Sequence, residues 1–247
     1  MRAGAASRAR GDFRAEPLPD EPYKVFANPP FDITSEIIAK LVDAAHPPDD
    51  TFLIVQHEAA ARYRGVPDET LVGLLLKPFF SPSIVHRFHR ADFVPAPSVE
   101  VVMLRLRKRG PPLVDPERAQ AYRDLVVTGL TAWRPTINDS LARSFGPTAA
   151  RRLLYDASVD PTLRPTQVPF ESWLRLHAAF ERMPHALRRR VGGAEARLRR
   201  QQSHVRKQHR SRAPRDDLGP SRRGIASRSA SSGFSVNGSP QRSEVVG

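Results

Sequence analysis

The stretch Tyr23-Lys24-Val25-Phe26-Ala27-Asn28-Pro29-Pro30-Phe31 decides the fold, because it has the pattern of a short buried strand that enters a tight turn. An Asn-Pro-Pro-aromatic turn also suits methyl transfer to the exocyclic amine of a nucleic-acid base, whose lone pair is delocalised into the ring. The Asn28 amide oxygen and the Pro29 carbonyl can accept hydrogen bonds from that amine. Proline fixes φ and has no N–H, which holds the Pro29 carbonyl in one direction. Phe31 can stack on a base taken out of its helix, so the predicted catalytic set is Asn28, Pro29, Pro30 and Phe31.

The apolar pattern downstream predicts the rest of an α/β sheet. We expect a helix from Thr34, a strand over 51–56, helical segments over 58–63 and 70–76, and strands over 83–88 and 99–106. The first two strands flank a helix and should be parallel, whereas the last two have no room for a crossover helix. The sequence therefore predicts a parallel sheet with an antiparallel edge, the C-terminal part of a Rossmann-like fold.

The character of the sequence changes after Pro111-Pro112. A helical stripe begins at Tyr122, and Trp133 and Trp173 fit a helical core. Beyond Arg182 the chain is rich in Arg, Ser, Gly and Pro, although its arginine clusters allow one isolated basic helix. The expected domains are a disordered or remnant segment 1–10, a partial Rossmann-like catalytic domain 11–112, a small all-α domain 113–181 and a disordered Arg-rich tail 182–247.

The net charge of +13 lies almost entirely in that tail, because residues 182–247 hold 16 of the 39 basic residues and 4 of the 26 acidic ones. The overall charge therefore does not indicate a positive face on the folded part. The absence of cysteine excludes disulfides and thiolate metal sites, and His57, His86 and His89 lack metal-ligand spacing. No apolar run is long enough for a membrane helix or a secretory signal. We expect a cytoplasmic protein without a metal or a membrane partner.

Several motifs follow one another in a consistent order. These are Gly11-Asp12-Phe13, Asn28 to Phe31, Val55 to Arg62, Phe93-x-Pro95-x-Pro97-x-Val99, Leu104-Arg105-Leu106, and Arg164-Pro165 before the helix of Trp173. The series resembles the ribosomal RNA adenine dimethyltransferases, the Erm and KsgA families, over roughly residues 11–181. The resemblance implies S-adenosylmethionine as cofactor, ribosomal RNA as partner, and a monomer.

Carried over position by position, the resemblance also implies site residues. Asp12 and Phe13 would bind the cofactor, and Asn28 would touch both cofactor and target amine. The pocket for the target base would comprise Phe31, Phe93, Pro95 and Pro97. We predict RNA contacts at Arg87, Arg90, Arg107, Lys108 and Arg109. Solvated side chains are an equal alternative for Arg87 and Arg90 and the usual case for a charge run such as residues 107–109. The chemistry implied is an SN2 transfer that depends on proximity and orientation more than on a strong base.

Three functions remain open at this stage. The favoured one is Erm-type methylation of an adenine in 23S rRNA, which blocks macrolide, lincosamide and streptogramin B binding and so gives antibiotic resistance. The first alternative is the KsgA-type dimethyltransferase, which takes part in small-subunit rRNA processing. The second alternative is a truncated, inactive remnant that only binds RNA, because no Gly-rich turn for the methionine end of the cofactor precedes Asp12. A strand and a Gly-rich turn encoded in frame upstream of Met1 would favour an enzyme.

Overall fold

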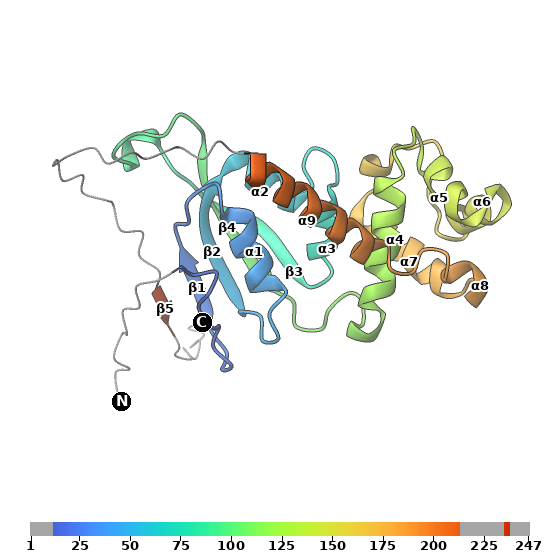
Figure 1. Ribbon diagram of the computed structural model, residues 1–247, viewed down its shortest axis with the longest axis horizontal. Coiled ribbons are helices and arrows are strands. Elements are labelled where there is room, and N and C mark those ends of the chain that lie inside the picture. The colour runs from blue at the N-terminus through green and yellow to red at the C-terminus, as the bar shows by residue number, and fades with distance from the viewer. Residues whose placement is uncertain (1–11, 213–234, 238–247) are drawn as a thin grey trace, which may run out of the picture. The chain divides into compact units, whose positions relative to one another are not determined.

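The computed structural model describes residues 12–212 and 235–237 (Figure 1). These residues divide into two compact units, one of residues 12–113 with 235–237 and one of residues 114–212. The expected segment 1–10 lies outside the described residues, as does most of the tail beyond 212.

The first unit is built on a five-stranded sheet with the order β3-β4-β2-β1-β5 (Figure 1). The strands are β1 Lys24–Ala27, β2 Asp50–Gln56, β3 Phe80–Arg87, β4 Val101–Lys108 and β5 Ser235–Asn237. β1 and β2 are parallel, and β4 runs antiparallel to both β2 and β3. The predicted parallel sheet with an antiparallel edge is therefore confirmed. β5 is a correction, because these three residues were assigned to a disordered tail and instead pair antiparallel with β1.

Three helices complete this unit: α1 Thr34–Val42, α2 His57–Arg64 and α3 Leu71–Leu76, with a short 3-10 turn η1 at Arg90–Asp92. All three helices occupy the expected segments. The Thr70 hydroxyl caps α3 by accepting a hydrogen bond from Gly73 N at 3.1 Å. α1 contributes fully buried aliphatic side chains to a core with β1, β2 and β4, chiefly Ile37, Ile38, Leu41, Leu53, Val55 and Leu104. This core fixes the carboxyl ends of β1 and β2, where the candidate site lies.

The second unit is entirely helical. Its elements are η2 Pro116–Arg118, α4 Ala119–Thr131, α5 Ile137–Phe145, α6 Pro147–Asp156, η3 Pro165–Gln167, α7 Phe170–Glu181, α8 His185–Arg188 and α9 Ala194–Arg212. Trp173 of α7 is fully buried, as predicted. A Cβ at Gly129 of α4 would lie 2.5 Å from the Trp173 ring, so the close approach of these two helices requires glycine there.

Two expectations about this unit need correction. The expected boundary at residue 181 is too early, because α8 and α9 follow it and α9 packs on α4 through hydrogen bonds to Asp124. The basic helix is therefore present but not isolated. Trp133 is 93% exposed rather than part of the core. α4 ends at Thr131, and Trp133 follows with a φ of 52°, so it leaves the apolar stripe of the helix.

Candidate active site

The turn after β1 is held in place by its second proline. Residues 28–33 join the end of β1 to the first residue of α1. The Pro30 carbonyl accepts hydrogen bonds from Ile33 N at 3.2 Å and from the Thr34 hydroxyl at 3.3 Å. Pro29 and Thr34 are buried, whereas Asn28 is exposed. Hydrogen bonds to the Pro30 carbonyl thus fix the turn to the start of α1, and Asn28 is exposed to solvent.

The two predicted acceptors of this turn have no partner within the protein. Among the described residues, neither the Asn28 side-chain amide nor the Pro29 carbonyl takes part in a hydrogen bond. Phe31 is 39% exposed although it is a large apolar residue. Two acceptors and an accessible ring therefore lie within four consecutive residues, as required for binding an amino group on a flat base.

The loop that joins β3 and β4 carries the other predicted pocket residues. Phe93 packs edge to face on Phe88 with ring centroids 5.4 Å apart, and Phe88 packs in the same way on His86 at 4.6 Å. The Asp92 carboxylate accepts a hydrogen bond from His89 N at 2.8 Å. Of the two prolines, Pro95 is exposed and Pro97 is half-buried. The loop is thus ordered by an aromatic stack at its base.

This loop and the turn after β1 lie at the same edge of the sheet. His57 N donates a hydrogen bond to the Glu100 carbonyl at 2.9 Å, which joins the end of the loop to the carboxyl end of β2. β1 ends at the same edge, because it is parallel to β2 with Ala27 opposite Leu53. β1 and β4 flank β2, so these two strands lie two strand spacings apart, roughly 10 Å, and β1 ends three residues before the level at which β4 begins. The structure therefore places Asn28 and the loop of Phe93 at the same edge of the sheet.

Asp12, the predicted cofactor contact, is engaged by a neighbouring arginine. Its carboxylate accepts hydrogen bonds from Arg14 Nε at 2.9 Å, Nη2 at 2.6 Å and the backbone N at 3.0 Å. The side-chain hydrogen bonds from Arg14 are the main cause that lowers the pKa of Asp12 to about 2. The same guanidinium reaches Glu36 of α1 at 3.1 Å. Asp12 is thus a half-exposed, ionised acceptor tied to α1.

Lys40 of α1 is a positioning residue that the sequence did not indicate. Its Nζ donates hydrogen bonds to the carbonyls of Phe13 at 2.6 Å, Arg14 at 3.2 Å and Glu16. The ammonium also lies 4.9 Å from the centre of the Phe13 ring, within the range of a cation–π contact. In sequence, Glu36 and Lys40 form an i, i+4 pair of the kind that usually lies on a solvated helix face. In the structure they instead hold the turn that carries Asp12 and Phe13.

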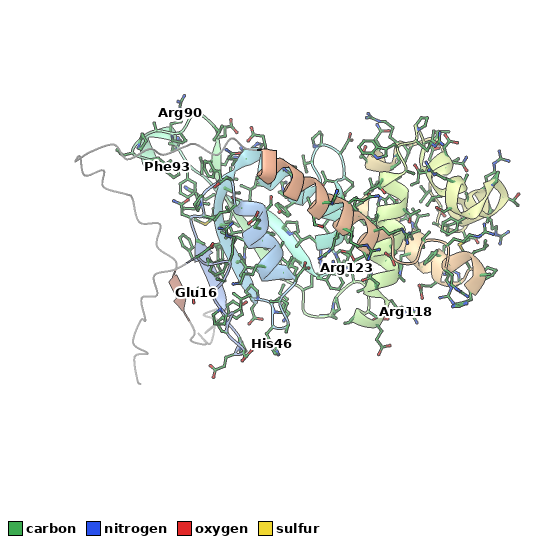
Figure 2. The ribbon with its side chains drawn as sticks, in the orientation of Figure 1. Glu16, His46, Arg90, Phe93, Arg118 and Arg123 are labelled. Atoms are coloured by element: carbon green, nitrogen blue, oxygen red, sulfur yellow. The ribbon has the colours of Figure 1, made fainter. Side chains whose placement is uncertain are left out.

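The predicted RNA-binding residues fall into two groups. Arg87 and Arg90 lie on or next to the loop of Phe93, and Figure 2 shows Arg90 and Phe93 together on it. Arg107, Lys108 and Arg109 lie at the far end of β4, which at eight residues is roughly 25 Å long. Arg109 also has a structural role, because its Nε donates to the Lys77 carbonyl at 2.8 Å. The structure does not bring the two groups into one patch.

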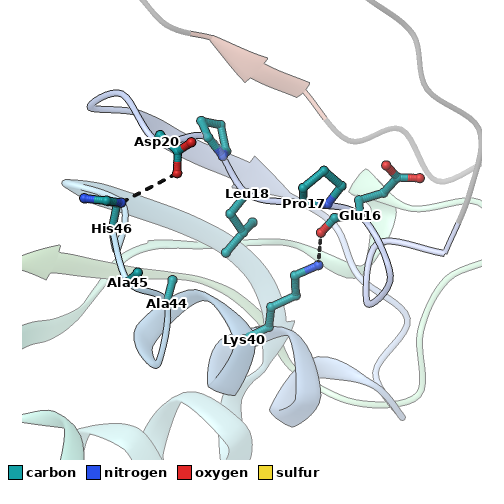
Figure 3. Close-up of a pocket in the computed structure, with 9 residues that line it drawn as sticks. Glu16, Pro17, Leu18, Asp20, Lys40, Ala44, Ala45 and His46 are labelled. Atoms are coloured by element: carbon teal, nitrogen blue, oxygen red, sulfur yellow. Dashed lines mark hydrogen bonds and ion pairs between the residues drawn. The ribbon is translucent and has the colours of Figure 1, made fainter.

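A surface hollow of about 350 Å³ lies beside Lys40 (Figure 3). Residues 16–20, Lys40 and residues 44–46 line it, at the end of α1 distant from Asn28. Its polar groups contact one another: His46 Nδ1 lies 3.7 Å from Asp20 Oδ1, and Lys40 reaches the Glu16 carbonyl. Among the described residues, no group of three or more His, Asp or Glu could hold a metal, and no helix is long and apolar enough to cross a membrane.

Comparisons with known proteins identify the family of the chain. The family model of ribosomal RNA adenine dimethylase matches residues 13–182. A ribosomal RNA small subunit methyltransferase A from Lactococcus lactis is 27% identical over 168 residues, which are 66% of this chain and 57% of that protein. An rRNA adenine N-6-methyltransferase from Corynebacterium diphtheriae is 32% identical over 143 residues, 57% of this chain and 55% of that protein. The chain thus spans less than two thirds of the length of these relatives.

Solved structures show the same fold. The crystal structure of the 23S rRNA methyltransferase ErmE superposes with a TM-score of 0.63 at 26% identity, covering 69% of this chain and 70% of that one. A dimethyladenosine transferase from Plasmodium falciparum superposes with a TM-score of 0.56 at 18% identity, covering 70% of this chain and 71% of that one, and supports the fold alone. With a family model that matches more than half of its length, the chain belongs to the ribosomal RNA adenine dimethylase family.

Proposed function

We propose that the protein acts in S-adenosylmethionine-dependent methylation of the exocyclic amine of an adenine in 23S rRNA, and so gives macrolide, lincosamide and streptogramin B resistance. The observation that carries this proposal is the pair of unpartnered acceptors, the Asn28 amide and the Pro29 carbonyl, beside the exposed Phe31 ring. The similarity to ErmE, a 23S rRNA methyltransferase, supports the choice of RNA.

In this mechanism, each group at the carboxyl edge of the sheet has its own role. The Asn28 amide oxygen and the Pro29 carbonyl accept hydrogen bonds from the adenine amine and hold its lone pair out of conjugation with the ring. Phe31 stacks on the flipped base, and the loop of Phe93 with Pro95 and Pro97 forms the second wall. Since the acceptors are fixed by the turn, they align the amine without reorganisation, which is the main requirement of an SN2 transfer.

The described residues fit one end of the cofactor better than the other. The ionised, half-exposed Asp12 carboxylate suits the amine of the cofactor's adenine, with Phe13 and Asn28 beside it. When bound, S-adenosylmethionine supplies an electrophilic methyl group. Its methionine end requires a Gly-rich turn after a further parallel strand. Among the described strands, β1 has a parallel neighbour on one side only, and the antiparallel β5 occupies its other edge.

Two alternatives have their own support. The Lactococcus lactis relative is named for the small ribosomal subunit, which favours a KsgA-type activity. The second alternative is an inactive remnant that only binds RNA, and its support is that no described strand pairs parallel with the other edge of β1. We therefore expect the 247-residue chain to bind S-adenosylmethionine weakly or not at all. A micromolar dissociation constant in a calorimetric titration would refute this expectation.

Methyl incorporation into in vitro transcripts tests the proposed function. The 247-residue chain and any in-frame upstream extension are each incubated with labelled S-adenosylmethionine and with 23S or 16S rRNA. Incorporation into 23S rRNA alone supports the proposal, and incorporation into 16S rRNA alone overturns the choice of RNA. In the active form, Asn28→Ala should lower the rate by about 10² to 10³ while changing the free energy of unfolding by less than about 0.5 kcal/mol. Glu117→Gln, at an exposed position of η2 in the helical unit, is the control and should retain the rate.

A further inference from the structure

Strand β1 is completed on its outer edge by a segment that is remote in sequence. Its inner edge pairs parallel with β2 along the whole length of β1. Its outer edge pairs antiparallel with β5, which lies more than two hundred positions later in the chain (Figure 1). The register runs from Lys24 opposite Asn237 to Phe26 opposite Ser235. The chain therefore supplies its own strand to an edge that would otherwise present unpaired backbone groups.

This pairing holds β5 only weakly. A strand of three residues is at the short end of the usual range. In the sequence, Gly233 and Gly238 flank these residues and Pro240 follows, and all three are of types that disfavour strands. With β5 in place, Lys24 is still exposed and Phe26 is 49% exposed. β5 can therefore leave β1 with little loss of buried surface.

The pairing also stops short of the candidate site. Within the described residues it ends at Phe26 of β1, and Asn28 belongs to the turn that leads to α1. That turn is fixed to the start of α1 by hydrogen bonds to the Pro30 carbonyl. Release of β5 therefore changes the edge of β1 and leaves the groups proposed to bind the target amine in place.

The two faces of the sheet are covered unequally in the described part of this unit. Helices α1, α2 and α3 share one core on the face to which Val25 points. The opposite face carries Phe26, Phe52, Ile54 and Met103, and none of these belongs to that core. α1 connects β1 to β2 over the first face, and right-handed crossovers on the two sides of a strand place their helices on opposite faces. A parallel strand at the outer edge of β1 would therefore bring its helix to the face of Phe26.

We propose that β5 is a displaceable strand that guards the outer edge of β1. While it is paired, no other strand has access to the backbone groups of residues 24–26 on that edge. A parallel strand that supports the methionine end of the cofactor must first release β5, so the pairing is an autoinhibitory contact. The inference deepens the proposed function, on which its consequence for S-adenosylmethionine rests, whereas the exchange of β5 does not depend on that function.

A disulfide between the two strands tests the contact directly, because the chain contains no cysteine. Lys24 and Asn237 lie opposite each other. Opposite residues of antiparallel strands have Cα atoms about 4.5 or 5.5 Å apart, within the range that a disulfide bridges. The full chain with Lys24→Cys and Asn237→Cys is equilibrated in glutathione buffers to measure the effective concentration of its two thiols. We expect a value at least about tenfold above that of the matched control, Lys24→Cys with Ser227→Cys, whose second cysteine precedes β5 by eight positions.

A second pair of variants prevents the pairing of β5 at constant charge and length. The β5 variant carries Ser235→Pro, Val236→Pro and Asn237→Pro, and its matched control carries Ser229→Pro, Ala230→Pro and Ser231→Pro. Proline has no N–H, so the β5 variant loses every backbone donor of the strand. Hydrogen exchange read by mass spectrometry should show outer-edge amides of β1 exchanging at least about tenfold faster in the β5 variant and at the wild-type rate in the control.

Sedimentation tests whether β5 excludes other strands. An uncovered edge of β1 should pair between copies of the chain, so the β5 variant should associate with rising concentration. The oxidised form of Lys24→Cys with Asn237→Cys should keep one mass over the same range. In a form that includes the in-frame upstream extension, this oxidised disulfide should weaken S-adenosylmethionine binding at least about tenfold, and reduction should restore it.

Equal effective concentrations in the two cysteine pairs would overturn the proposal, as would unchanged exchange of β1 or a single mass in the β5 variant. An extended form that binds the cofactor equally well when oxidised and reduced would also overturn it. The expected disulfide, exchange and sedimentation results without methyl transfer to any rRNA would refute the proposed function and leave β5 as a guard. Methyl transfer at the same rate by the oxidised and reduced extended forms would do the reverse.

Discussion

Replacing Asp124 by Ala should release α9 from α4 while the rest of the helical unit stays folded. The wild-type carboxylate is almost fully buried and accepts two backbone hydrogen bonds, from Gly193 N and Glu195 N. Loss of a capping acceptor costs about 0.5–2 kcal/mol, and an unpaired buried donor costs about 1–3 kcal/mol. These two costs are not fully additive, because both include the loss of the same hydrogen bonds. We therefore expect Asp124→Ala to reduce the free energy of unfolding by about 2–3 kcal/mol.

Hydrogen exchange read by mass spectrometry locates the effect. Peptides from α9 should exchange much faster in Asp124→Ala, whereas peptides from α4 and α7 should retain most of their protection. Urea unfolding measures the total loss. The matched control is Asp156→Ala, because Asp156 pairs with Arg152 on an exposed helix face and should contribute less than about 1 kcal/mol. Unchanged protection of α9, or equal losses in the two variants, would refute the assigned anchor.

Two further predictions concern the core of the helical unit. Burial lowers the pKa of His177, although Glu181 at 3.7 Å opposes the shift, so the unfolded chain binds the proton more readily than the folded one. Stability is then complete above about pH 6.5 and declines as the pH falls below it, and His177→Phe should flatten this decline in urea titrations between pH 7 and 5. Trp173→Ala should cost about 3–5 kcal/mol, whereas Trp133→Gly should cost less than about 1 kcal/mol because the site is exposed and its positive φ favours glycine. Similar losses for the two tryptophans by circular dichroism would contradict the core assignment.

Strands β1 to β4 could be predicted because each is encoded by a contiguous pattern of residues in the sequence. The run that became β2 is apolar on both faces, as buried parallel strands are, and the short link between β3 and β4 leaves no room for a crossover helix. The expectation that Val25 to Ala27 form a buried strand was wrong in part, because β1 alternates, with Val25 and Ala27 buried and Phe26 49% exposed. β5 was not predictable in this way. Its three residues, Ser235–Asn237, have no strand pattern of their own and form a strand only by pairing with β1, which is remote in sequence.

The same distinction applies to the candidate site. Asn28, Pro29 and Phe31 lie within one turn, so their chemistry can be inferred from the sequence alone. The contacts of Lys40 with the turn of Asp12 depend on how α1 packs, and residue spacing does not encode this. Asp124 and Glu195 are similar cases. In sequence, one is a polar residue in an apolar stripe and the other a single acid in a basic run, and only the packing of α9 on α4 shows that they form one junction.

The two edges of β1 divide the proposed methyl-transfer site into two parts with different requirements. The part proposed to bind the target amine comprises the turn after β1 and the loop before β4, which lie at the edge fixed by the core that β1 shares with β2 and α1. The part that binds the methionine end of the cofactor requires a parallel strand on the other edge of β1. β5 pairs with that edge through Lys24, Val25 and Phe26. A parallel strand would need the same backbone groups, so it and β5 exclude each other, while the geometry of Asn28 depends on neither.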